Sequence, residues 1–115
     1  MIFSESLKKN RDFQQVYRRG ASAANRALVM YVLENPLEKN RIGISVSRKV
    51  GNSVVRHKLT RRIREGYRLQ EARFKRGYDI VFIARGNAKD CAQPEIERAI
   101  AHLAGKHHVW KEESE

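Results

Sequence analysis

The chain has 115 residues, 41% of them hydrophobic, and it carries 24 Lys and Arg against 13 Asp and Glu, a formal net charge of +11. This length and hydrophobic content predict one folded domain over residues 1–115 and exclude a disordered chain. Since no apolar run could cross a bilayer, no secretory signal opens the sequence and Cys91 is the one cysteine, we expect a cytoplasmic protein with no membrane partner and no intrachain disulfide.

The first predicted element is a short helix. Asn10 is suited to cap its start and Gly20 to end it. Between them, Phe13, Val16 and Tyr17 recur at the three- and four-residue spacing that places side chains on one helical face.

Two strands follow, separated by a turn over residues 34–40. Residues 27–33 form a continuous apolar run, which predicts a strand buried on at least one side. Over residues 42–47, apolar side chains alternate with small ones at the period of a half-buried strand, so the second face of this strand leaves room above the sheet. A short extra strand is expected near Ser22.

A long helix over residues 53–74 is the central predicted element. Val55, Leu59, Ile63 and Tyr67 recur at every fourth position and predict an apolar stripe that anchors the helix. At about 100° per residue, the opposite arc carries a cationic ridge. The ridge consists of His57, Lys58, Arg61, Arg62, Arg64 and Arg68.

The remaining elements complete an α+β fold. Residues 78–84 are apolar on both faces and predict a central strand, and a helix from Pro94 places Ile96 and Leu103 inward. Residues 111–115 form a polar tail that is expected to fray. The order α-β-β-(β)-α-β-α predicts a small two-layer sandwich, with the helices on one sheet of roughly four strands.

The positive charge is concentrated in one stretch of the chain. Residues 41–76 hold 12 Lys and Arg and two acidic residues, so they carry +10 of the formal net charge of +11. A field this uneven favours a polyanionic partner, with nucleic acid ahead of an anionic membrane, an acidic protein or a merely solvated surface. Several arginines on one ridge would neutralise several phosphates and make binding strongly salt-dependent.

Motifs for catalysis are absent from the sequence. It has no Gly-rich phosphate loop, no HExxH and no close set of acidic residues that would hold two Mg²⁺ ions. His107 and His108 are adjacent and diverge on a helix, which favours surface histidines over a metal site. Phe13, Tyr17 and Tyr31 are suited either to stack unpaired bases or to pack in the core, and spacing alone favours the core for Phe13.

Residues 50–65, VGNSVVRHKLTRRIRE, closely resemble the basic helix of the protein subunit of bacterial ribonuclease P and the Val-Gly-Asn turn before it. Further matches follow in the family's order between residues 7 and 85, among them Asp12-Phe13, Asn25-Arg26 and residues 79–85. The sequence departs from the family at four positions. Ser53 stands where Ala is usual and His57 where Asn is usual, while Lys58 replaces the common Arg and Thr60 replaces a basic residue.

The resemblance implies membership of a ribonucleoprotein endonuclease that removes the 5′ leader from precursor tRNA. In that family the large RNA subunit is catalytic, and the Mg²⁺ that the holoenzyme requires is held mainly by RNA. No catalytic residue, metal motif or small-molecule substrate is therefore implied for the protein. The resemblance also implies a left-handed β-α-β crossover, against the usual right-handed rule.

The resemblance further assigns roles to individual residues. The catalytic RNA would be bound by Arg56, His57, Lys58, Arg61, Arg62, Arg64 and Arg68. The single-stranded leader would lie in a cleft between the first helix and the sheet, lined by Phe13, Tyr17, Tyr31, Ser45, Ser47, Arg48, Lys49 and Arg85.

Three other functions stay open at this point. A general RNA-binding or ribosome-associated module would share the basic helix without needing a leader-selective aromatic cleft. An autonomous metal-dependent nuclease would cleave precursor tRNA without an RNA subunit. A DNA-binding protein would place the basic helix in the major groove, although the ridge carries few Asn or Gln side chains to read bases.

Overall fold

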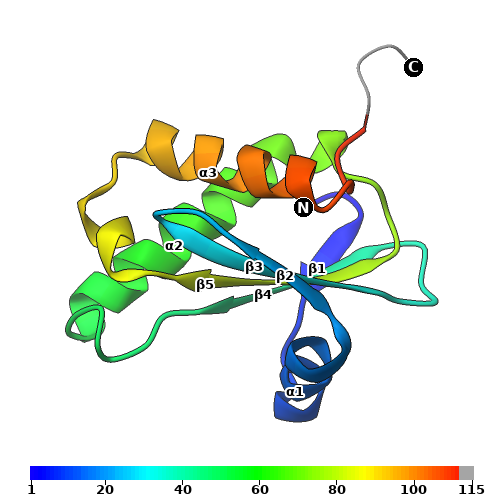
Figure 1. Cartoon of the computed structure of the whole chain (residues 1–115), viewed down its shortest axis with the longest axis horizontal. Coiled ribbons are helices and arrows are strands. Elements are labelled where there is room, and N and C mark those ends of the chain that lie inside the picture. Colours follow the sequence, from blue (N-terminus) through cyan, green and yellow to red (C-terminus); the bar gives the residue numbers. More distant parts are fainter. Residues whose placement is uncertain (112–115) are drawn as a thin grey trace.

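A five-stranded mixed sheet forms the centre of the computed structural model, which describes residues 1–111 (Figure 1). Its strands follow the spatial order β1-β4-β5-β3-β2. β1 and β5 lie parallel to β4, whereas β3 lies antiparallel to β5 and β2 lies antiparallel to β3. The strands are β1 (Ser4–Ser6), β2 (Ala21–Ala24), β3 (Leu28–Glu34), β4 (Asn40–Ser45) and β5 (Tyr78–Ala84).

Helices cover both faces of this sheet. The helices are α1 (Asn10–Arg19), α2 (Ser53–Gln70) and α3 (Gln93–Lys106), with short 3₁₀ helices η1 (Glu71–Arg73) and η2 (Gly86–Asp90). α2 and α3 lie on one face, and α1 lies alone against the other (Figure 1). The predicted α+β fold is thus confirmed, but the sheet has five strands rather than roughly four, and α1 adds a third layer to the expected two.

The main core lies between the sheet and the pair of helices α2 and α3. The predicted stripe of α2 is confirmed for Leu59, Ile63 and Tyr67, which are each at most 1% exposed, while Val55 at the start of the helix is half-buried. These side chains meet the inward face of the strands and of α3. The main contributors there are Leu28, Met30, Ile80, Phe82, Ile96, Ile100 and Leu103.

A second, smaller core lies under α1. Leu7, Val16 and Val81 are buried there, with Phe13 and Tyr17 packed beside them, so the predicted apolar face of α1 is confirmed. Small residues on β4 make this packing possible, as the sequence alternation indicated. A Cβ atom added at Gly43 would lie 2.6 Å from two ring carbons of Phe13.

The ends of the two N-terminal helices differ from the prediction. Asn10 is the first residue of α1 rather than its cap, because Lys9 before it already has extended backbone angles. Gly20 does end α1, and its N–H donates to the Val16 carbonyl at 2.8 Å. α2 ends at Gln70 and continues as η1, so the fully buried Phe74 lies after the helix and pairs with Trp110.

Buried polar residues account for the two parts of the sheet that hydrophobic periodicity did not predict, namely β1 and the start of β4. β4 begins at Asn40, which is fully buried and hydrogen-bonded to Tyr67, to the Lys75 carbonyl and to the Tyr78 N–H. β1 has the polar sequence Ser-Glu-Ser, and Glu71 holds the residues before it by accepting hydrogen bonds from backbone N–H groups. β1 lacks the apolar alternation that predicts a strand, whereas β4 was predicted from the alternation over residues 42–47 and begins earlier, at Asn40.

Two further expectations concern the connections and the C-terminal tail. α2 supplies the crossover between the parallel strands β4 and β5, and the left-handed sense of that crossover stays a prediction of the resemblance. Of the predicted tail, residues 112–115 lie outside the described part of the chain. No helix within residues 1–111 is both long enough and apolar enough to span a membrane.

Candidate nucleic-acid interface

The cationic ridge of α2 is exposed along the side of the helix that faces away from the core. Asn52 caps the helix by accepting a hydrogen bond from the Val55 N–H at 3.0 Å, and the buried stripe fixes the rotation of the helix. The opposite arc therefore faces solvent. All six predicted ridge residues are exposed there, namely His57, Lys58, Arg61, Arg62, Arg64 and Arg68.

Members of the ridge differ in how much of their charge is available to a partner. Arg68 forms a bidentate pair with Glu65, at 2.8 and 2.5 Å, and this hydrogen bonding raises the pKa of Arg68 and lowers that of Glu65. Arg62 donates to the Cys91 carbonyl at 3.2 Å. Within residues 1–111, Lys58, Arg61 and Arg64 form neither a salt bridge nor a side-chain hydrogen bond, so they are the cations most available to phosphate.

Arg56, the seventh residue assigned to the catalytic RNA, is less exposed than the six ridge residues. It is half-buried at the start of α2 and donates to the Gly51 carbonyl at 3.1 Å. Its guanidinium therefore braces the turn that leads into the helix.

Strand register places the aromatic residues on the face of the sheet that α1 covers. Tyr31 of β3 lies opposite Val81 of β5, which lies opposite Gly43 of β4. Because alternate residues of a strand point to the same face, the next row on that face joins Val29 and Ile83 to Ser45. The ring of Tyr31 and the α1 rings of Phe13 and Tyr17 thus lie on the same face of the sheet as Ser45.

The three predicted aromatic residues form a continuous cluster. The ring centroids of Phe13 and Tyr17 are 6.4 Å apart, and Tyr17 meets Tyr31 edge-on at 5.2 Å and 72°. Burial raises the pKa of the Tyr17 hydroxyl, against a lowering hydrogen bond with Ser45. All three rings are half-buried, so each packs against the small core with one part and stays accessible with another.

Of the remaining residues assigned to the leader, three follow Ser45 along the chain and the fourth, Arg85, lies elsewhere. Ser47, Arg48 and Lys49 are exposed in the turn that directly follows β4, beyond Ser45. Arg85 lies apart from the aromatic cluster, because its guanidinium donates to the Asn25 carbonyl at 3.0 Å at the β2–β3 connection.

Sequence reasoning missed two apolar members of this surface and the ion pair that supports it. Val29 and Ile83 are half-buried beside Ser45, and only the strand register reveals that they are neighbours. Arg41 forms a bidentate pair with Asp79, at 2.8 and 2.6 Å, and lies 3.5 Å from Asp12 of α1. The hydrogen bonds to Asp79 raise the pKa of Arg41, and the network ties the start of α1 to the sheet.

Metal ligands do not gather on the described surface. Within residues 1–111 there is no group of three or more His, Cys, Asp or Glu side chains that could hold a metal ion.

Comparison with known proteins gives one consistent family. The family model described as Ribonuclease P matches residues 2–108. The "Ribonuclease P protein component" of Alkaliphilus metalliredigens is 52% identical over 106 residues, covering 92% of this chain and 96% of the relative. The protein of the same name from Lachnoclostridium phytofermentans is 53% identical, over 92% of this chain and 91% of its own length.

Solved structures agree with these relatives. The RNase P protein of Staphylococcus aureus superposes with a TM-score of 0.84 at 39% identity, covering 92% of this chain and 97% of that one. The RNase P protein from Thermotoga maritima superposes with a TM-score of 0.81 at 28% identity, covering 88% and 96% respectively.

Proposed function

The chain belongs to the ribonuclease P protein family, and on that premise we propose that it acts as the protein component of a ribonuclease P ribonucleoprotein. This enzyme removes the 5′ leader of precursor tRNA by endonucleolytic cleavage. The observation that carries the proposal is a family match over residues 2–108, which includes both the basic ridge and the aromatic surface.

The RNA subunit performs the cleavage in this proposal, and the Mg²⁺ ions that the holoenzyme requires are held mainly by RNA. The protein contributes binding energy and position. Its two surfaces support this division of labour, since one is built of guanidinium and ammonium groups and the other of aromatic rings. These are groups that bind phosphates and bases rather than groups that break a phosphodiester bond.

The exposed ridge of α2 binds the catalytic RNA. Lys58, Arg61 and Arg64 supply charge directly, whereas Arg68 reaches a phosphate only in competition with Glu65. Neutralising RNA phosphates here lowers the repulsion between RNA segments and favours the folded RNA at low Mg²⁺.

The aromatic surface binds the 5′ leader. Phe13, Tyr17 and Tyr31 offer partly exposed rings on which unpaired bases stack, with Ser45 beside them and Arg48 and Lys49 in the adjacent turn. Because mature tRNA has no leader, contacts here favour the precursor over the product.

Reconstitution tests the whole proposal. The purified protein is added to the RNase P RNA of the same genome, and cleavage of precursor tRNA is measured at low Mg²⁺ together with the affinities for precursor and mature tRNA. We expect faster cleavage and tighter binding of the precursor. Absence of stimulation would contradict the function, equal affinities would contradict the leader contact, and cleavage by the protein alone would contradict catalysis by RNA.

A further inference from the structure

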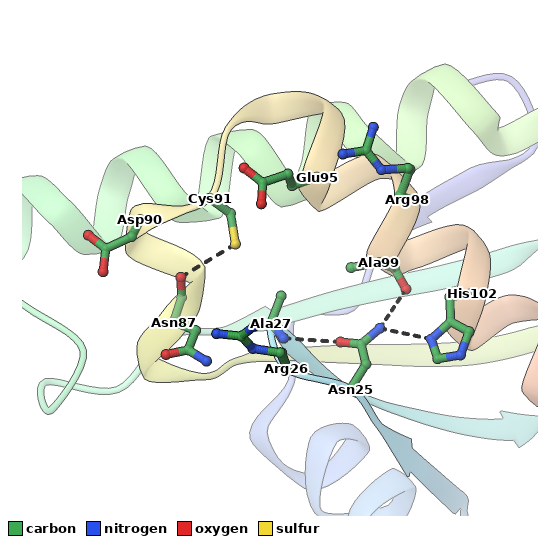
Figure 2. A pocket seen from close by; sticks show the side chains of 10 residues that line it. All are labelled: Asn25, Arg26, Ala27, Asn87, Asp90, Cys91, Glu95, Arg98, Ala99 and His102. Carbon is green, nitrogen blue, oxygen red and sulfur yellow. Dashed lines mark hydrogen bonds between the residues drawn. The ribbon is translucent and has the colours of Figure 1, made fainter.

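A pocket that neither proposed RNA surface includes lies between the β2–β3 connection, η2 and the first turns of α3 (Figure 2). Its volume is about 530 Å³, within the range of pockets that hold a small organic ligand. Asn25 and Arg26 line it from the connection, Asp90 from η2, and Glu95, Arg98 and His102 from α3.

The charged groups around this pocket are of both signs. Arg26 and Arg98 are exposed guanidiniums of the kind that holds a phosphate through paired N–H donors. Asp90 and Glu95 are acceptors, although Glu95 already accepts a hydrogen bond from the Ala92 N–H at 3.0 Å. A nucleotide satisfies both kinds of group, since it carries hydroxyl and amino donors beside its phosphate, whereas a bare phosphate would be repelled by the carboxylates.

Asn25 fixes the chemical character of the pocket floor. Its Oδ1 accepts hydrogen bonds from the N–H groups of Ala27 and Leu28, at 3.2 and 3.0 Å, which sets the orientation of the amide. Its Nδ2 therefore donates, to the Ala99 carbonyl at 3.1 Å and to Nδ1 of His102 at 3.3 Å (Figure 2). Since Nδ1 accepts this hydrogen bond, the neutral imidazole carries its proton on Nε2 and can donate from there.

The pocket is joined directly to the basic ridge. Arg62 donates to the carbonyl of Cys91, a residue of the pocket wall, at 3.2 Å. Gln93 in turn donates to the carbonyl of Arg62 at 2.9 Å. An RNA strand that lies along α2 therefore passes the rim of the pocket.

From this geometry we propose that the pocket binds one nucleotide of a single-stranded RNA segment, with Arg26 and Arg98, on opposite sides of the pocket, holding the two phosphates that flank it (Figure 2). The inference rests on the proposed function, because it requires RNA on the ridge of α2. The nucleotide comes either from the catalytic RNA or from the precursor tRNA, and both sources offer the same phosphate and sugar groups.

The reactivity of Cys91 reports whether the pocket is occupied. It is the one cysteine of the chain, is half-buried, and directs its thiol into the pocket (Figure 2). Burial, reinforced by Glu95, raises the pKa of this thiol, so its alkylation by iodoacetamide is followed at mildly alkaline pH. The rate is measured by mass spectrometry for the free protein, for its complex with RNase P RNA, and for the complex with precursor tRNA added.

We expect RNA to slow the alkylation of Cys91 several-fold, and the first arm that shows protection identifies the source of the nucleotide. The double variant Arg26→Ala with Arg98→Ala should return the rate toward that of the free protein. The matched control, Lys89→Ala with Lys106→Ala, removes the same charge from η2 and α3 outside the pocket and should keep the protection. Both arginines are exposed, and Arg98→Glu provides a second variant if the double variant unfolds.

Two outcomes overturn the proposal. One is an unchanged alkylation rate in both RNA arms. The other is protection that persists in the pocket variants, because RNA would then screen the thiol from the ridge alone. Cleavage of precursor tRNA is measured in the same samples. Full stimulation by the parent protein without protection of its Cys91 refutes only the pocket, and absence of both stimulation and protection in the parent protein refutes the proposed function as well.

Discussion

Glu71 is a buried acidic residue, 3% exposed, whose carboxylate accepts hydrogen bonds from the backbone N–H groups of Ile2 and Phe3, at 2.7 and 3.2 Å. Burial raises its pKa, but hydrogen bonds with Ser4, Ile2 and Phe3 together outweigh that effect, and the pKa lies below its ordinary value. A group whose pKa is lowered on folding stabilises the fold above its unfolded pKa. That stabilisation is lost as the pH falls through the folded pKa.

We predict that Glu71→Gln lowers the free energy of unfolding by about 1–3 kcal/mol at pH 7, because a neutral amide accepts these hydrogen bonds less strongly. The difference from the parent protein should shrink on acidification, as the parent carboxylate becomes protonated. Urea unfolding at neutral and acidic pH measures both effects. Glu38→Gln, at an exposed loop position, is the control, and an equal loss in that variant would contradict the role of Glu71.

At the same scale, Tyr31 tests the aromatic surface. Its ring contacts Tyr17 edge-on and is half-buried, so Tyr31→Ala removes a stacking platform from the proposed leader site. We expect the affinity of the holoenzyme for precursor tRNA to fall by about 1–3 kcal/mol, the usual contribution of one stacked base. The affinity for mature tRNA and for the RNA subunit should change little, and an equal loss in all three would assign Tyr31 to the core alone.

At the scale of elements, α2 combines a buried stripe and an exposed ridge in one helix. Arg61 and Arg64 form no ion pair or side-chain hydrogen bond within residues 1–111, so replacing both with Ala should leave the fold intact. We predict weaker binding of the catalytic RNA and a salt dependence whose logarithmic slope falls by about 0.7–0.9 for each lost phosphate contact. Filter binding over a range of salt concentrations measures the slope. Lys89→Ala with Lys106→Ala is the charge-matched control, and an unchanged slope in the ridge variant would exclude this face.

The junction between α1 and β2 depends on the absence of a side chain. A Cβ atom at Gly20 would lie 2.5 Å from the Val16 carbonyl oxygen and 2.9 Å from that of Val32, and both are backbone atoms. Gly20→Ala should therefore destabilise the fold by about 1–3 kcal/mol through steric overlap, measured as a lower thermal midpoint. Gly86→Ala is the control, since no atom lies within 4 Å of its added Cβ.

Most elements could be predicted from the sequence because their apolar residues repeat with a clear period. Leu59, Ile63 and Tyr67 set the rotation of α2, and the apolar run over residues 80–84 of β5 predicted its central position in the sheet. β1 could not be found, because its pairing depends on contacts with Glu71 and Tyr67 that are more than 60 residues distant.

The site was predictable in part for the same physical reason. Helical spacing alone locates the exposed ridge of α2, since one buried stripe determines the opposite arc. The aromatic surface instead depends on strand register, which brings Val29 and Ile83 beside Ser45. The pocket around Asn25 forms where the β2–β3 connection, η2 and α3 meet, and no local sequence pattern predicts that contact.

On the scale of the whole molecule, the positive charges of residues 41–76 repel one another within the folded free protein and lower its stability. We predict that raising NaCl from about 20 mM to about 500 mM increases the thermal midpoint of the free protein while weakening its complex with RNA. Thermal scans and binding isotherms in the same buffers measure the two trends. The Arg61→Ala and Arg64→Ala double variant should show a smaller rise, and an equal rise would mean that salt acts by another route.

The position of β5 in the sheet determines when the protein can fold during its synthesis. β3 and β4 do not pair with each other, because β5 lies hydrogen-bonded between them. The ribosome must therefore release residues up to Ala84 before these earlier strands can be joined, and α2 is already synthesised by then. The basic helix α2 is thus synthesised before the sheet that buries its apolar stripe can be completed.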